Sequence, residues 1–206
     1  MDSGRLIRIA VLVSGGGTNL QALIDAQGRG ELRSGRIELV ISNKEGAYAL
    51  ERAQKAGIKT LTVVKDKSAS DPQADFEKRI VDALEEHGIE LIILAGFMSI
   101  LSADFTRRYP ERIINVHPAL IPSFCGKGFY GLKVHEAALE YGVKVTGATV
   151  HFVNEIPDGG RIIKQKAVYI EDGDTPEILQ KRVMEQAEWI ILPQAAEEVC
   201  AALQGI

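Results

Sequence analysis

A chain of 206 residues with 46% hydrophobic and 25% charged residues has the composition of an ordinary globular protein, and it is long enough to bury an apolar core without disulfides or a structural metal. Lys and Arg number 24 against 28 Asp and Glu, so the formal net charge of −4 gives no broad attraction to nucleic acid. No stretch approaches the roughly 18 apolar residues that a membrane span requires, so we expect one cytoplasmic domain over residues 1–206 with no membrane partner.

The first half of the chain alternates apolar, β-branched runs with helical patterns. The runs predict strands at 7–13, 37–41, 58–64, 89–95 and 112–116, and the segments between them predict helices near 19–28, 46–56, 73–87 and 102–109. Because the runs are too continuous for a sheet exposed on one side, they indicate parallel strands covered by helices on both faces. We therefore expect a single-domain, doubly wound, Rossmann-like α/β fold with a mostly parallel sheet.

The second half predicts an antiparallel extension of this sheet and a long C-terminal helix. Strand-like runs at 145–153 and 161–170 are separated by the turn-rich linker NEIPDGG, which favours a hairpin. Thr175 and Pro176 are typical of a helix start. The segment that follows stays helical until Pro193, where a kink or break is expected.

The two cysteines give no indication of a metal site. Cys125 and Cys200 belong to no C-x-x-C motif and to no His/Cys cluster. Because structural zinc needs such a set of ligands, we expect no bound metal and two partly buried thiols.

Ligands of a doubly wound sheet bind beyond the carboxyl ends of its strands, so the glycine-rich segment 14–19 (SGGGTN) is the first candidate site. Glycines let the backbone approach an anion closely, and the helix start presents free N–H groups and a positive dipole end. The segment predicts a phosphate cradle, with a flexible turn as the alternative. It is not a P-loop, and Leu20 stands where a dinucleotide fingerprint has its third glycine.

Two further strand ends carry candidate residues. The segment 95–101 (AGFMSIL) is suited to wall a pocket for a flat aromatic ligand, although plain core is the alternative. Asn115 and His117 end the fifth strand and point to one face by alternation. An amide N–H and an imidazole N–H can together stabilise the oxyanion of a tetrahedral intermediate, whereas an ordinary hydrogen-bonded histidine is the alternative for His117.

Asp158 precedes two glycines in the hairpin linker, a pattern that is typical of a turn. Its functional interest depends on whether the fold brings it to His117. There the carboxylate would orient the imidazole and raise its pKa by attraction between opposite charges. His151 precedes the linker and is a candidate for the border of the pocket, whereas His135 is expected on the surface of a helix.

Taken together, these segments resemble a known enzyme family. SGGGTNL, AGFMSIL, NVHPALIP and HFVNEIPDGG are similar to motifs of the phosphoribosylglycinamide formyltransferases, a folate-dependent family of purine biosynthesis, and the resemblance covers nearly the whole chain. The N-x-H-P motif with a later D-G-G is shared by the wider formyltransferase superfamily, so it indicates the chemistry more than the acceptor. The glycine loop and the length are more selective for this family.

The resemblance implies a reaction and its participants. The cosubstrate would be 10-formyltetrahydrofolate, and its formyl group would pass to the amine of 5′-phosphoribosylglycinamide to give formylglycinamide ribonucleotide and tetrahydrofolate without a metal. The enzyme would be a monomer or a homodimer that binds only small molecules. A formyltetrahydrofolate hydrolase, a methionyl-tRNA formyltransferase and a non-catalytic nucleotide-binding module are the alternatives.

The resemblance also implies roles for individual residues. The catalytic group would consist of Asn115, His117 and Asp158. The acceptor would be bound by Gly16, Gly17, Thr18, Asn19 and Glu188. The folate would be bound by Met98, Ser99, Ile100, Leu101 and Asn115.

Four features depart from the family pattern. Ser99 and Gln73 stand at or near places where relatives have an arginine, and Trp189 replaces a histidine. The loop 124–131 is longer than in shorter relatives, and either a mobile lid or a static excursion would fit it.

Overall fold

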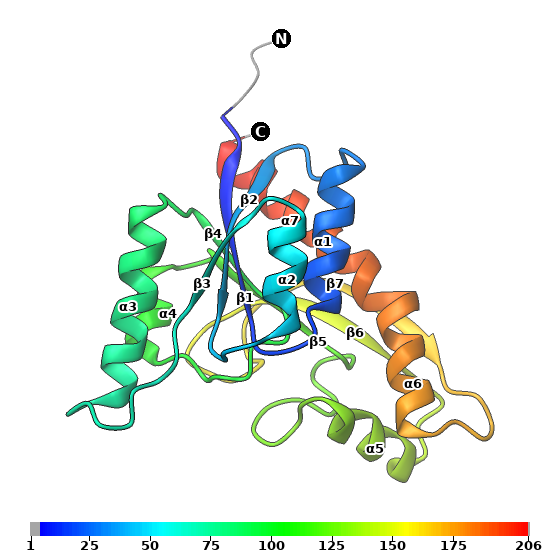
Figure 1. Ribbon diagram of the computed structural model, residues 1–206. Coiled ribbons are helices and arrows are strands. Elements are labelled where there is room, and N and C mark those ends of the chain that lie inside the picture. The colour runs from blue at the N-terminus through cyan, green and yellow to red at the C-terminus, as the bar shows by residue number, and fades with distance from the viewer. Residues whose placement is uncertain (1–4, 206) are drawn as a thin grey trace.

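The computed structural model describes residues 5–205, in which strands and helices alternate (Figure 1). The elements, in chain order, are β1 (Ile7–Val13), α1 (Thr18–Gly28), β2 (Gly35–Ser42), α2 (Tyr48–Lys55), β3 (Lys59–Thr62), α3 (Pro72–Glu86), β4 (Leu91–Leu94), α4 (Ala103–Arg108), β5 (Ile113–His117), α5 (Leu132–Tyr141), β6 (Val145–Phe152), β7 (Ile162–Tyr169), α6 (Pro176–Val183), a π-helical turn (Met184–Glu188) and α7 (Trp189–Gln204). No helix within residues 5–205 is long and apolar enough to cross a membrane.

The strands form one seven-stranded sheet in the order β3-β2-β1-β4-β5-β6-β7. Strands β1 to β5 pair in parallel, whereas β6 is antiparallel to β5 and β7 is antiparallel to β6. The predicted doubly wound sheet with an antiparallel C-terminal extension is therefore confirmed. Because β1 lies between β2 and β4, the strand order reverses at β1, and ligands of such sheets bind at this point.

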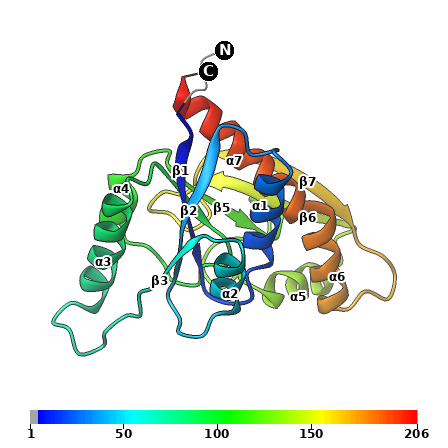
Figure 2. The ribbon, with the colours of Figure 1, turned by 45° about the horizontal axis from the view of Figure 1, so that its top comes forward.

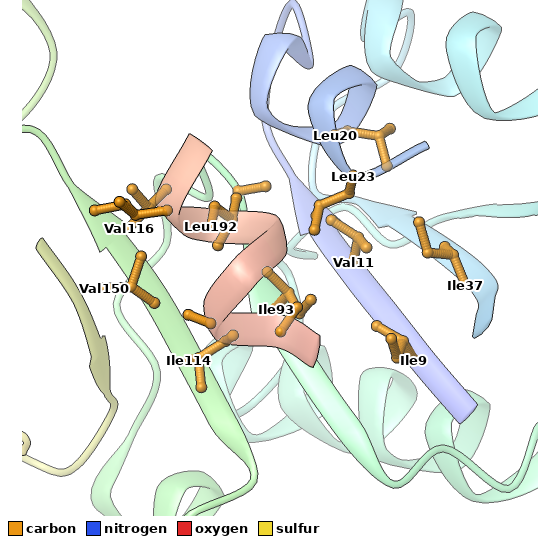
Figure 3. Close-up of a cluster of buried hydrophobic side chains, with 14 of the residues drawn as sticks. Ile9, Val11, Leu20, Leu23, Ile37, Ile93, Ile114, Val116, Val150 and Leu192 are labelled. Atoms are coloured by element: carbon orange, nitrogen blue, oxygen red, sulfur yellow. The ribbon is translucent and has the colours of Figure 1, made fainter. Parts of the chain in front are cut away.

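Two apolar layers enclose the sheet. On β1, Ile9 and Val11 face one layer, whereas Ala10 and Leu12 face the other, as strand alternation requires. The first layer is covered by α1, α2 and the C-terminal helical segment, and the second by α3 and α4 (Figures 1 and 2). Figure 3 shows Leu192 of α7 directed into the first layer.

Helix boundaries follow the local signals of the sequence. The side chain of Asp71 accepts hydrogen bonds from two backbone N–H groups at the start of α3, and Thr175 does the same for one N–H of α6. Proline occupies the first turn of both helices. Gly57 and Gly88, which follow α2 and α3, have φ values of 71° and 58°, the left-handed conformation expected after a helix.

The predicted break at Pro193 is wrong. Helix α7 continues through Pro193, and the irregular part is the preceding π-helical turn. A proline lacks the N–H and crowds the carbonyl four residues earlier, which here belongs to Trp189 at the start of α7. The disturbance is thus accommodated at the junction of the two segments, where the π-helical turn also buries Glu188.

The expectation that His135 lies on the surface is also wrong. Its side chain is fully buried together with Val134 and Ala138 on the inner side of α5. Burial lowers the pKa of His135 to about 4, and the nearby His117 acts in the same direction. His135 is therefore a neutral member of the packed interior at neutral pH.

Candidate active site

Four polar side chains gather on one face of β5 and β6. Asn115 is paired with His151 across the two strands, and His117 is paired with Thr149. Because directly opposed residues project to the same face, all four point to the same side of the sheet. This is the face that carries α3 and α4, since Ile113, which shares their alternation, belongs to that apolar layer.

Asp158 reaches this group from the linker between β6 and β7. One carboxylate oxygen, Oδ2, lies 3.6 Å from His117 Nδ1, and the other, Oδ1, lies 3.5 Å from His151 Nε2. The linker can return over the strands because Gly160 has no side chain, since a Cβ there would stand 1.7 Å from the carbonyl oxygen of Phe152. The functional interest of Asp158 depended on its closeness to His117, and this condition is met.

The backbone of the loop 118–131 fixes the tautomer of His117. Its Nε2 lies 2.8 Å from the carbonyl oxygen of Phe124, and since a carbonyl only accepts, Nε2 carries the proton. Burial lowers the pKa of His117 more than Asp158 and the Phe124 carbonyl raise it. The expected effect of Asp158 is present, but burial outweighs it, so the pKa lies below the usual histidine value.

Asp158 is stabilised as a carboxylate. Burial acts to raise its pKa, but the nearby imidazoles of His151 and His117 and the Gly126 N–H together lower it below the usual value. The Gly126 N–H donates to Oδ2 over 2.8 Å. Asp158 also has a left-handed backbone, with φ of 56°, which is uncommon for a residue other than glycine and is found at functional sites.

His151 fixes the orientation of the Asn115 amide. Its Nδ1 lies 2.8 Å from the Phe152 carbonyl oxygen and must therefore carry a proton. In the neutral imidazole Nε2 is then an acceptor, and the Asn115 Nδ2 lies 3.3 Å away. One amide hydrogen of Asn115 is thus directed to His151, which leaves the second free for a ligand. The sequence indicated His151 only as a border of the pocket.

Two backbone groups of the loop 118–131 complete the cluster, and neither was foreseen from the sequence. The Phe124 carbonyl accepts the Nε2–H of His117, and the Gly126 N–H donates to the Asp158 carboxylate. Phe124 and Gly126 have φ values of 47° and 85°. The run of glycines in this loop was the available signal, because left-handed backbone favours glycine, but it does not reveal which atoms the loop contacts.

The glycine loop after β1 is fixed against α2. The Ala49 N–H donates to the Gly15 carbonyl over 3.0 Å, and Arg52 Nε donates to the Gly16 carbonyl over 2.8 Å. At Gly17, where φ is 71°, a Cβ would stand 2.6 Å from the Cβ of Ala49. No side chain caps α1, so its first N–H groups are not occupied by a side-chain acceptor. These features suit the predicted phosphate cradle.

Two of the residues that the resemblance assigns to acceptor binding, Asn19 and Glu188, lie in contact although they are far apart in the sequence. Asn19 Nδ2 donates to Glu188 Oε2 over 2.6 Å. Burial raises the pKa of Glu188 to about 7, although the hydrogen bond from Asn19 acts against this shift. Trp189, the next residue, lines a cavity of about 290 Å³ together with Thr18 and Arg52.

The segment assigned to the folate follows β4 and exposes part of its apolar surface. Met98 is 50% exposed and Ile100 is 72% exposed, whereas Leu101 packs into the apolar layer under α3 and α4. The Ser99 hydroxyl accepts a hydrogen bond from Asn43 Nδ2 over 2.7 Å. The side chain of Leu101 therefore belongs to the core, while those of Met98 and Ile100 are available to a ligand.

Comparisons with known proteins identify the family of the chain. The formyl transferase family model matches residues 7–196. Over 180 residues the chain is 41% identical to the chloroplastic phosphoribosylglycinamide formyltransferase of Arabidopsis thaliana, covering 87% of the chain and 61% of the relative. It is 39% identical to the phosphoribosylglycinamide formyltransferase of Escherichia coli, covering 87% of the chain and 81% of the relative. The chain thus spans less than two thirds of the plant relative, and it spans 18% of the trifunctional purine biosynthetic protein of Gallus gallus.

The fold is also similar to those of solved structures. Glycinamide ribonucleotide transformylase 1 from Symbiobacterium toebii superposes with a TM-score of 0.87 at 41% identity, covering 96% of the chain and 89% of that structure. A formyltetrahydrofolate deformylase from Burkholderia mallei superposes with a TM-score of 0.83 at 29% identity, covering 98% of the chain and 68% of that structure. On the family match over residues 7–196, the chain belongs to the formyl transferase family.

Proposed function

We propose that this chain transfers the formyl group of 10-formyltetrahydrofolate to the amine of 5′-phosphoribosylglycinamide, with residues 1–206 acting as one catalytic domain. The observation that carries the proposal is the cluster of Asn115, His117 and Asp158, at the same end of the sheet as a glycine loop suited to phosphate. Relatives named for this reaction, at about 40% identity over most of the chain, support it.

The oxyanion of the tetrahedral intermediate is stabilised by two N–H donors. The amine nitrogen attacks the formyl carbon, and the carbonyl electrons move to the formyl oxygen. We assign this role to the Nε2–H of His117 and to the amide hydrogen of Asn115 that is not directed to His151. In the present conformation the Phe124 carbonyl accepts the His117 proton, so the formyl oxygen takes the place of that carbonyl when the folate binds. The developing charge in turn raises the pKa of His117.

Breakdown of the tetrahedral intermediate requires the transfer of a proton from the former amine to N10. The bond between the formyl carbon and N10 breaks, N10 gains a proton and the former amine loses one, so no net proton is consumed. Asp158, ionised because its pKa is lowered, accepts and returns this proton through a water. No covalent enzyme intermediate is needed, and the enzyme acts as a monomer or a homodimer on small molecules alone.

A hydrolase is the second candidate, and the similarity to a formyltetrahydrofolate deformylase is the observation in its favour. Both reactions use the same oxyanion donors and differ in the nucleophile, which is water in the hydrolase. The glycine loop after β1 would be without a role in a hydrolase, because neither water nor formate carries a phosphate.

The test follows the fate of the formyl group. Purified protein is incubated with 10-formyltetrahydrofolate, with and without 5′-phosphoribosylglycinamide, and tetrahydrofolate, formate and the formylated amide are quantified. We expect tetrahydrofolate to form only with the amine present and in equal amount to the formylated product. Release of formate at the same rate without the amine would establish the hydrolase instead.

A further inference from the structure

The segment from Met98 to Ile100 combines exposed apolar side chains with a firmly held backbone. Met98 and Ile100 are 50% and 72% exposed, although apolar side chains of this size are usually buried. The backbone N–H of Met98 donates to Ser14 Oγ over 2.7 Å, and Asn43 binds the Ser99 hydroxyl over 2.7 Å. The segment is therefore an apolar surface held in one conformation, and a surface of that kind suits a ligand.

A buried carboxylate on α3 holds Ser102, just after this segment. Glu77 is 7% exposed and lies among the apolar residues of α3, beside Phe76 and Ile80. Its Oε1 accepts the backbone N–H of Ser102 over 2.6 Å, and its Oε2 accepts the Ser102 hydroxyl over 2.5 Å. No Lys or Arg forms an ion pair with Glu77 within residues 5–205, so hydrogen bonds alone balance this buried charge.

Glu77 controls the exposed segment at two points. Through Ser102 it fixes the start of α4, because the Ser102 hydroxyl also caps the Phe105 N–H over 3.1 Å. Through Gln73, whose amide also donates to Glu77, it fixes Ile100, since Gln73 Nε2 donates to the Ile100 carbonyl over 3.2 Å. Gln73 therefore lies in a hydrogen-bond chain that ends on the backbone of the exposed segment.

We propose that Glu77 is a positioning residue for the folate, because it holds the Met98–Ile100 segment in the conformation that receives the flat ring system of the cosubstrate. This inference rests on the proposed function and deepens it. Glu77 contacts no reacting atom, so it contributes to folate binding and not to the chemical step. Burying a carboxylate costs stability, and a residue that served only to pack α3 would not need one.

The test is the substitution Glu77→Gln, which keeps the shape of the side chain but removes its charge. Two charge-assisted hydrogen bonds to Ser102 are weakened, so we expect the KM for 10-formyltetrahydrofolate to rise about tenfold. The KM for the phosphorylated amine and kcat should stay within about twofold of wild type, because the glycine loop and Asp158 are untouched. Asp82→Asn, which removes an exposed carboxylate on the same helix, is the matched control and should change neither KM.

The outcomes separate this inference from the proposed function. If the wild-type protein does not transfer the formyl group, the proposed function is lost before any variant is compared. If wild type is active and folded Glu77→Gln leaves the folate KM unchanged, or raises both KM values equally, the positioning role is wrong. Should Glu77→Gln fail to fold, Gln73→Leu decides in its place, since it removes the side-chain link between Glu77 and the Ile100 carbonyl, together with the bond to Lys65, and leaves the bonds of Glu77 to Ser102. A selective rise in the folate KM supports the role and an unchanged value refutes it.

Discussion

Among the polar residues of the site, burial dominates the electrostatics. Asp158 favours the charged form of His117, yet burial keeps the pKa of His117 below its usual value while Asp158 stays ionised. A neutral imidazole with a proton on Nε2 can donate a hydrogen bond to an oxyanion, and the negative charge of the oxyanion favours the charged ring. Burial also favours the neutral form of Glu188, which for a carboxyl group means that its pKa is raised.

The raised pKa of Glu188 predicts a specific dependence of stability on pH. The pKa rises from 4.5 to about 7 on folding, so this contribution to stability is fully present below pH 4.5 and is lost as the pH rises through about 7. A shift of this size corresponds to roughly 3 kcal/mol.

We expect Glu188→Gln to abolish most of the pH-dependent loss of stability. Urea denaturation between pH 4.5 and 8 measures the free energy of unfolding of both proteins, and wild type should lose stability relative to the variant across that range. Parallel curves for the two proteins would show that folding does not raise the pKa of Glu188.

At the scale of elements, the loop 118–131 and the linker 153–161 meet over the ends of β5 and β6. The alternation of β5 predicts correctly that Asn115 and His117 share a face. It does not predict that the Phe124 carbonyl and the Gly126 N–H contact the site, because those contacts depend on left-handed backbone within the loop. The burial of His135 was missed because a single histidine on a helix is equally compatible with either face.

The loop contacts predict the reactivity of Cys125, which lies between Phe124 and Gly126. Burial, with a smaller effect of Asp158, raises the pKa of its thiol, so alkylation by iodoacetamide at pH 7.5 should be slow. Gly126→Ala places a side chain at φ of 85°, which costs roughly 1 to 2 kcal/mol and should open the loop and speed alkylation by up to about tenfold.

Two features make this measurement selective. Burial raises the pKa of Cys200 to about 12, so labelling reports on Cys125. Gly46→Ala introduces similar backbone strain, at φ of 65°, outside the loop and is the matched control. Equal alkylation rates in Gly126→Ala and wild type would mean that the loop is not held by its left-handed glycine.

At the scale of the whole molecule, the fold was predictable and the site only in part. Continuous apolar runs such as 7–13 and 89–95 require cover on both faces, and the two apolar layers on either side of β1 provide it. The meeting of Asp158 with His117 could be stated only as a condition, because it depends on the close return of the linker at Gly160. Glu77 gave no signal at all, since one acidic residue in a helical pattern is ordinarily solvent-exposed.

The central claim is that Asp158 and His117 act together on the formyl group. The most direct test is kcat for formyl transfer by Asp158→Asn, which keeps the size of the side chain and removes its charge, with the exposed Asp104→Asn as control. We predict that kcat falls at least about 100-fold in Asp158→Asn and is unchanged in Asp104→Asn. A correctly folded Asp158→Asn protein with kcat within about threefold of wild type would contradict the account.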